Sequence, residues 1–329
     1  MTGSRFMRAS FLRPSLLALA SAAMLAACGG GGGGDSGGSS STQLAITSDN
    51  ATSAARAGVA GMVTSEMAGT ADNGVFGTSG INGIVDLQTR RAHSLAAHAL
   101  AQGRSQIAAS ATVNCAVSGS MTVNFDDRNG NGAFDAVGES ISISAANCVQ
   151  DAGSSLSGAF TLTLNQFTSL TNLTLGLSFS NFSASDAASG MSTAINGSLT
   201  AARSSATLVT VRSDALTVGV TAKGSSHSYS AQGLVATVDA NSTRTQQTLS
   251  GTFSSSDFGG KSVKVSTPVA VQTLAADDYP SSGTVLVEGS TGSAVKLEAV
   301  SATQVRQSLD ANGDGTFEST VVKLWSELF

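Results

Sequence analysis

Apolar residues recur at every second position from Ala111 to the C-terminal end of the chain. Because successive side chains of a β-strand point to opposite faces, this period predicts strands that bury one face and expose the other. Thr, Ser and Gly fill the intervening positions, as in half-buried antiparallel sheets. We expect about twelve or more strands. The alternation is clearest for Phe160, Leu162 and Leu164, for Leu173, Leu175, Leu177 and Phe179, and for Leu216, Val218, Val220 and Ala222.

Short clusters of Gly, Ser, Asn and Asp separate these stretches, for example Ser189–Gly190, Lys223–Ser225 and Asp257–Gly260. Such breaks are typical of hairpins, whereas parallel strands need long crossover segments. A meander with one apolar face must curl, close or stack to hide that face. The predicted fold is therefore mainly β. It is a long antiparallel meander over residues 111–329 that forms a rolled or barrel-like sheet, with a sandwich as the alternative.

Residues 44–110 differ because they are rich in Ala and poor in β-branched runs. Apolar residues there follow a helical spacing, which predicts one or two helices near the N-terminus. Such a helix either packs on the sheet as an amphipathic element or occupies a groove that a ligand would otherwise fill. The positions that carry the spacing are Ala55, Val59, Met62, Val63 and Met67, and then Leu87, Leu95, Ala96, Ala99 and Leu100 within Val85–Ile107.

Residues 1–27 have the composition of a removable signal. Arg5, Arg8 and Arg13 precede an apolar run, Leu16–Ala27, that is too short to cross a bilayer of about 30 Å as a helix. Removing this segment takes away three of the 17 basic side chains and none of the 22 acidic ones, so the net charge goes from −5 to −8. A chain with this negative net charge is not attracted electrostatically to anionic lipid.

The signal ends in Leu25-Ala26-Ala27-Cys28, which resembles the lipobox of bacterial lipoproteins. The resemblance implies that the Cys28 thiol carries diacylglycerol and that the chain is cut before it. Residues 28–43 are rich in Gly and Ser and would form a flexible tether. Similar lipoproteins stay at the inner membrane when Asp follows the cysteine, and here Gly29 follows it. We therefore expect the outer membrane, on its periplasmic face or at the cell surface, with Cys28 as the contact to the membrane.

Cys115 and Cys148 remain once Cys28 is assigned to lipid. An even pair in an oxidising compartment predicts a disulfide. In the chain-entropy model, closing a loop of about 34 residues is worth roughly 4 kcal/mol. A redox role would need a close motif such as C-x-x-C, which the pair lacks.

Two acidic turns follow the pattern D-x-N-x-[DN]-G, in which oxygens at positions 1, 3 and 5 converge on a hard cation and Gly at position 6 makes the sharp turn. The Glu expected at position 12 is missing from both, because Gly138 and Val321 stand there and Glu139 is one residue late. These turns resemble calcium-type loops between strands, and Ca²⁺ is the one cofactor we consider. The alternative is a pair of plain Asn-Gly and Asp-Gly turns. The candidate ligands are Asp127, Asn129, Asn131 and Asp135 in the first turn, and Asp310, Asn312, Asp314 and Glu318 in the second.

Composition and motifs exclude several other functions. Charged residues make up 12% of the chain and show no basic excess, which argues against a nucleic-acid partner. No G-x-S-x-G elbow, H-E-x-x-H pair, G-K-[ST] phosphate loop or zinc-spaced Cys/His set is present. The three histidines, His93, His98 and His227, have no obvious partner and are interpreted as solvated. We therefore do not expect an enzyme, and no catalytic residue is assigned.

The C-terminal L-D-x-N-G-D-G run, the strand after it and the Cys-bearing first unit resemble β-rich outer-membrane lipoproteins of Gram-negative bacteria, a group that implies no particular activity. The leading interpretation is a non-enzymatic, lipid-anchored envelope domain with a binding or scaffold role toward an envelope protein or lipid. One alternative is a carrier that holds a lipid or other hydrophobic ligand on an apolar concave sheet. A second is an envelope hydrolase, whose carboxylates would have to come from distant strands.

The lipobox generates the first testable prediction. Cells grown with radiolabelled palmitate should label this protein, and the Cys28→Ala variant should carry no label because it has no thiol to acylate. An unlabelled wild-type chain, or label that survives Cys28→Ala, would show that the lipobox resemblance misleads.

Overall fold

The computed structural model describes residues 43–76, 108–149, 154–186, 191–222, 225–277 and 279–328. Cys28, the signal, most of the tether and the second expected helix at 85–107 lie outside the described residues, as do His93 and His98. The prediction of a mainly β chain with an antiparallel meander is confirmed.

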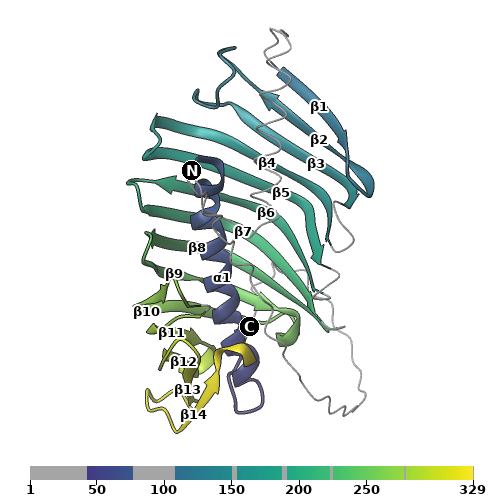
Figure 1. The fold of residues 1–329 in the computed structure, drawn as a ribbon. Coiled ribbons are helices and arrows are strands. Elements are labelled where there is room, and N and C mark those ends of the chain that lie inside the picture. Colours follow the sequence, from purple (N-terminus) through teal and green to yellow (C-terminus); the bar gives the residue numbers. More distant parts are fainter. Residues whose placement is uncertain are drawn as a thin grey trace, which may run out of the picture.

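Fourteen strands form one sheet in which each strand pairs antiparallel with the next along the chain. The order is therefore sequential, and β1 and β14 are two separate edges (Figure 1). The sheet curls without closing, so it is the rolled form of the prediction and not a sandwich. The strands are β1 (Ala108–Asn114), β2 (Ser118–Asp126), β3 (Ser140–Val149), β4 (Ser154–Ser169), β5 (Asn172–Asp186), β6 (Met191–Arg203), β7 (Leu208–Ala222), β8 (Ser225–Ala240), β9 (Arg244–Ser255), β10 (Ser262–Leu274), β11 (Ser282–Glu288), β12 (Ala294–Ala299), β13 (Gln304–Asp310) and β14 (Ser319–Leu324).

Connections alternate between the two ends of the strands, because the sheet is a simple meander. One end, the first rim, carries the turns that follow the even-numbered strands β2 to β12 and the end of β14. The second rim carries the turns that follow the odd-numbered strands, including the short 3-10 turns η1 (Ser256–Phe258) and η2 (Ser290–Gly292) and the β13–β14 loop. A third 3-10 turn, η3 (Trp325–Glu327), follows β14.

Bulges bend the central strands and give the sheet its curl. At one of them Gly158 of β4, with φ +85°, faces the carbonyl oxygen of Asn181 in β5, where any Cβ would collide. The same arrangement sets Gly119 against the carbonyl oxygen of Asn147. Asn147 and Asn181 themselves have positive φ. An extra residue in one strand increases local twist and kinks it, so such bulges turn a flat meander into a rolled one.

The helix α1 (Ala51–Phe76, 26 residues) lies across β6 to β12 (Figure 1). It begins directly after Asn50, whose side-chain oxygen accepts a hydrogen bond from the Thr47 amide at 2.9 Å. Among the described residues, no helix is both long and apolar enough to span a bilayer.

Small residues let α1 approach the apolar face of the sheet closely. A Cβ at Gly58 would lie 3.0 Å from Cγ2 of Val287, and one at Gly61 would lie 2.9 Å from Cζ of Phe253. Ala54 and Ala57 are fully buried on the same helix. Because the residues at these contacts are small, α1 comes close enough to shield the branched side chains of the sheet from water.

The segment before α1 and the C-terminal turn η3 are both held by hydrogen bonds to the rest of the fold. The Leu44 amide donates to the carbonyl of Ser262 at 2.8 Å, and Leu44 in turn accepts from the Ser290 amide at 2.8 Å. At the other end of the chain, Nε1 of the buried Trp325 donates to the carbonyl of Pro280 at 2.9 Å. Arg56 Nη2 donates to the carbonyl of Glu327 at 3.2 Å, which brings the C-terminal turn to the first turns of α1.

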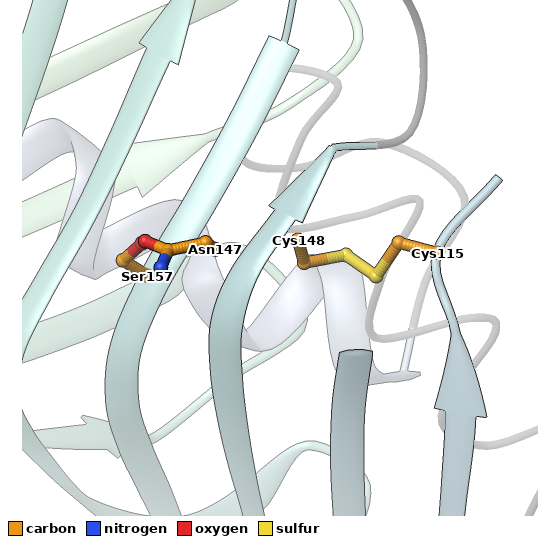
Figure 2. The surroundings of a disulfide bond; sticks show 4 residues. All are labelled: Cys115, Asn147, Cys148 and Ser157. Carbon is orange, nitrogen blue, oxygen red and sulfur yellow. A yellow bond between two sulfur atoms is a disulfide. The ribbon is translucent and has the colours of Figure 1, made fainter. Parts of the chain in front are cut away.

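The disulfide joins Cys115 and Cys148 at the second rim, with their Cα atoms 5.4 Å apart (Figure 2). Cys115 follows β1 and Cys148 lies in β3, so the bond reaches across β2. Next to it, Ser157 Oγ donates to Asn147 Oδ1 at 3.0 Å. The predicted pairing is therefore seen, and it ties down one edge of the sheet.

The close helix–sheet contact generates a stability prediction. Gly61→Val should lower the free energy of unfolding by about 1–3 kcal/mol, because the new side chain meets the Phe253 ring and forces the layers apart. Ser53→Val, a β-branched substitution at a half-exposed position of the same helix, is the control and should cost well under 1 kcal/mol, roughly the helix-propensity difference. Urea unfolding followed by circular dichroism measures both. Equal losses in the two variants would contradict the packing argument.

Candidate metal centre

The two acidic turns occupy different places in the fold. Loop A, residues 127–139, joins β2 to β3 at the first rim, and loop B, residues 310–318, joins β13 to β14 at the second rim. They lie near opposite edges of the sheet, because β2 and β13 are each next to an edge strand. They therefore cannot share one ion, and each must be judged as a separate site.

The first carboxylate of each loop is buried and organises the turn. Asp127 accepts hydrogen bonds from the amides of Gly130 at 2.8 Å and Gly132 at 2.7 Å, and its side chain is 1% exposed. In loop B, Asp310 does the same with the glycines at the equivalent positions, Gly313 at 2.7 Å and Gly315 at 2.9 Å. The shared sequence pattern thus folds in the same way twice.

Positions 3 and 5 also repeat between the loops. In loop A, Asn129 accepts from the Asn131 amide at 3.0 Å, and Asn131 accepts from the Ala133 amide at 2.7 Å. In loop B, Asn312 accepts from the Asp314 amide at 2.8 Å, and Asp314 accepts from the Thr316 amide at 2.7 Å. These bonds wind each loop into a tight coil, and the side-chain oxygens lie on the inner side of that coil.

Loop B brings three carboxylates together. Oxygens of Asp310, Asp314 and Glu318 all lie within 4.8 Å of one another. The Thr316 amide, then the Asn312 side chain, hold the pKa of Asp314 below its usual value, so this group stays ionised in mildly acid solution. Glu318 Oε2 accepts from the Ala311 amide at 3.1 Å, which folds the end of the loop back over its start. The arrangement concentrates negative charge and oxygen ligands of the kind that hard divalent cations prefer.

Loop A lacks this cluster, although it was predicted with the same ligand positions. Position 5 is Asn131, so one carboxylate is missing, and no group of three acidic ligands forms in loop A among the described residues. Asp135 instead accepts from the side-chain amides of Asn129 at 2.8 Å and Asn131 at 3.0 Å. Its charge is therefore already met by donors of the loop itself.

Glu139, which lies one residue after position 12 of the loop pattern, has a different role. It is fully buried, and its Oε2 accepts from the amides of Asp135 at 2.8 Å and Ala136 at 2.9 Å. Its Oε1 has no hydrogen-bond partner. Glu139 thus locks the exit of loop A as an internal acceptor.

Sequence reasoning missed one paired site. His227, interpreted as solvated, lies with Nδ1 2.9 Å and 3.0 Å from the two carboxylate oxygens of Asp257. The side chains are 34% and 19% exposed. Only the register of β8 against β9, which sets Tyr229 opposite Ser255, brings residues 30 positions apart together. No local motif marks such a pair.

The surroundings of His227 are open. A surface hollow of ≈ 290 Å³ beside it is bordered by small residues, among them Thr221, Ser226 and Ser256. Among the described residues, Asp257 is the hydrogen-bond partner of the His227 side chain. Burial, then the Asp257 charge, raises the pKa of the neighbouring Tyr229 to about 12, against a smaller lowering by Arg56, so that phenol remains protonated.

Comparison with known proteins gives no match. No protein-family model, no curated protein sequence and no solved structure matches this chain. The geometry of loop B, the Cys115–Cys148 bond and the open rolled sheet are therefore the observations on which a function has to rest.

Proposed function

We propose that this protein is a non-enzymatic envelope scaffold, tethered to the outer membrane by lipid at Cys28, whose C-terminal sheet edge is fixed by Ca²⁺ in loop B. The observation that carries the metal part is the convergence of Asp310, Asp314 and Glu318 within 4.8 Å. The lipobox resemblance and the tether support the anchored part. Position 7, Thr316, would add a carbonyl ligand in the usual order of such loops.

Calcium in loop B has a direct structural consequence. The loop connects β13 to β14, and Leu309 of β13 pairs with Ser319 immediately after it. An ion that holds Asp310 at the start of the loop to Glu318 at its end would fix the register of the edge strand. Three mutually repelling carboxylates would also lose their repulsion. The ion would therefore act as a clip on the edge of a scaffold.

A scaffold fits the described sheet better than a carrier. Over β6 to β12 the apolar face is occupied by α1, and residues such as Val211 and Val287 are fully buried there. Two surface hollows of ≈ 280 and ≈ 290 Å³ are open to solvent and not enclosed. Sites that hold a drug-sized ligand usually bury most of its surface in a cavity of about 300–1,000 Å³. The hydrolase alternative gains the His227–Asp257 pair, but in the part of the chain that the structure describes no nucleophile is hydrogen-bonded to that histidine.

Calorimetry on the chelator-treated chain tests the metal site. Ca²⁺ should bind with one site per chain and a Kd of about 10⁻⁴ to 10⁻³ M, as in other weakly charged loops outside the cytosol. The melting temperature should rise with Ca²⁺ because binding favours the folded state. The double variant Asp314→Asn, Glu318→Gln should lose both effects, because it removes two of the three carboxylates.

Asp135→Asn, the equivalent change at position 9 of loop A, is the matched control and should leave the calcium heat unchanged. Absence of heat and of any melting shift at millimolar Ca²⁺ would make loop B a plain turn. Loss of the heat in Asp135→Asn, with the loop B variant unaffected, would place the ion in loop A and overturn the assignment.

A further inference from the structure

Exposed large aliphatic side chains are distributed unevenly between the two rims. Single exposed Leu or Val residues are common on soluble proteins and need no explanation. Among the described residues, however, six exposed Leu or Val side chains lie at the first rim, and only one, Val117, lies at the second rim. Their exposed fractions run from 36% to 57%. The six are Val137, Leu170, Leu208, Leu274, Val300 and Leu324.

Each of the six belongs to a different connection or strand end. Val137 lies in loop A, Leu170 in the β4–β5 turn and Leu208 at the start of β7. Only the β8–β9 turn, Asn241–Thr243, has no apolar residue at this rim. Turns at this end of the long central strands lie one after another along the sheet (Figure 1). Neighbouring turns are two strands apart, about 9–10 Å.

The turns that carry these side chains are held firmly. Arg203 Nη1 donates to the carbonyl of Leu170 at 3.1 Å. The Leu208 amide donates to Ser205 Oγ at 3.1 Å, and the Leu208 carbonyl accepts from the Ser204 amide at 3.1 Å. Beside Val137, Glu139 Oε2 accepts from the Ala136 amide at 2.9 Å, and the Glu139 amide donates to the Ala136 carbonyl at 3.1 Å. Backbone polar groups of these turns are thus hydrogen-bonded, while the ends of the aliphatic side chains (the aliphatic tips) project into solvent.

We propose that the first rim is a membrane-contact edge, in which these aliphatic tips enter the interface of a zwitterionic lipid bilayer. Aliphatic side-chain ends that stand about 10–20 Å apart, with polar residues between them, form no continuous patch of the kind that a protein partner covers. A fluid bilayer closes around each tip separately, and its free energy gain follows the apolar area buried. The proposal goes beyond the acyl anchor, because it concerns residues of the folded sheet.

Charge at the rim favours neutral headgroups over anionic ones. Arg128, Arg203 and Arg244 come to this rim, and so do Asp239 and Asp277. Asp126 pairs with Arg128 at 3.8 Å. The chain as a whole carries −5, so an anionic surface would repel it. Binding is therefore expected to depend on apolar burial and to gain nothing from anionic lipid.

The predicted anchor does not prevent this contact. Gln43 pairs with Ser262 at the second rim, where the described chain begins. β10, which begins at Ser262, has 13 residues, so the two rims are about 40 Å apart along that strand. Fourteen residues lie between Cys28 and Gln43, and this stretch reaches at most about 50 Å when extended. A lipid at Cys28 and the first rim can therefore meet the same membrane.

Vesicle sedimentation tests the proposal on the full chain with Cys28→Ala, which cannot be acylated, so the result does not depend on the lipobox. This chain should bind phosphatidylcholine vesicles. Adding Val137→Ser, Leu170→Ser and Leu208→Ser should lower the partition coefficient at least about tenfold, because three aliphatic side chains no longer enter the bilayer. The control set Val117→Ser, Val269→Ser and Val322→Ser removes three equally exposed valines elsewhere and should change it less than about twofold.

No binding of the Cys28→Ala chain, or equal losses in the two triple variants, would overturn the proposal. Binding only to anionic vesicles would overturn it as well. If the rim variant instead converts a dimer into a monomer in size-exclusion chromatography, the rim is an interface between copies and not a membrane edge. A separate readout avoids triple substitution: an environment-sensitive fluorophore on Leu170→Cys should shift to the blue on vesicles, and the same label on Val117→Cys should not.

Discussion

The structure depends on one requirement, that a fourteen-stranded sheet with a single apolar face must keep that face from water. A closed barrel would meet the requirement by joining its edges, but this sheet remains open. It curls at its bulges, and α1 lies on the apolar side of β6 to β12. Gly58 and Gly61 matter because they let the helix reach the Val and Phe side chains of the sheet directly. Burial of apolar surface is the main favourable term in folding, and this interface supplies part of it.

An open sheet has two edge strands, and each end of this sheet is secured by a different device. Near β1, the Cys115–Cys148 bond reaches across β2 and ties the first three strands together. Near β14, loop B joins the last hairpin, and Trp325 anchors the chain beyond it through the carbonyl of Pro280. A disulfide persists wherever the surroundings are oxidising, whereas the proposed calcium clip would depend on the ion. The two edges would therefore respond differently to their surroundings.

Much of this was predictable from local sequence patterns. The period of two predicted the strands, and the D-x-N-G pattern predicted two loops of the same shape around Asp127 and Asp310. Long-range contacts were not predictable. Which strands α1 crosses, and therefore why Gly61 must be small, follows from the curl of the sheet. The His227–Asp257 pair needs the β8–β9 register, and the ligand difference between the loops rests on a single Asn at position 131.

Hydrogen–deuterium exchange read by mass spectrometry tests the central claim, that an open sheet is sealed on one face by α1. Amides of β7 to β11, paired on both sides and covered by the helix, should exchange most slowly. Those of β14, which has β13 as its only sheet neighbour, should exchange fastest among the strands. Protection of β1 and β14 equal to that of the central strands would mean that the edges meet, and would contradict the open architecture.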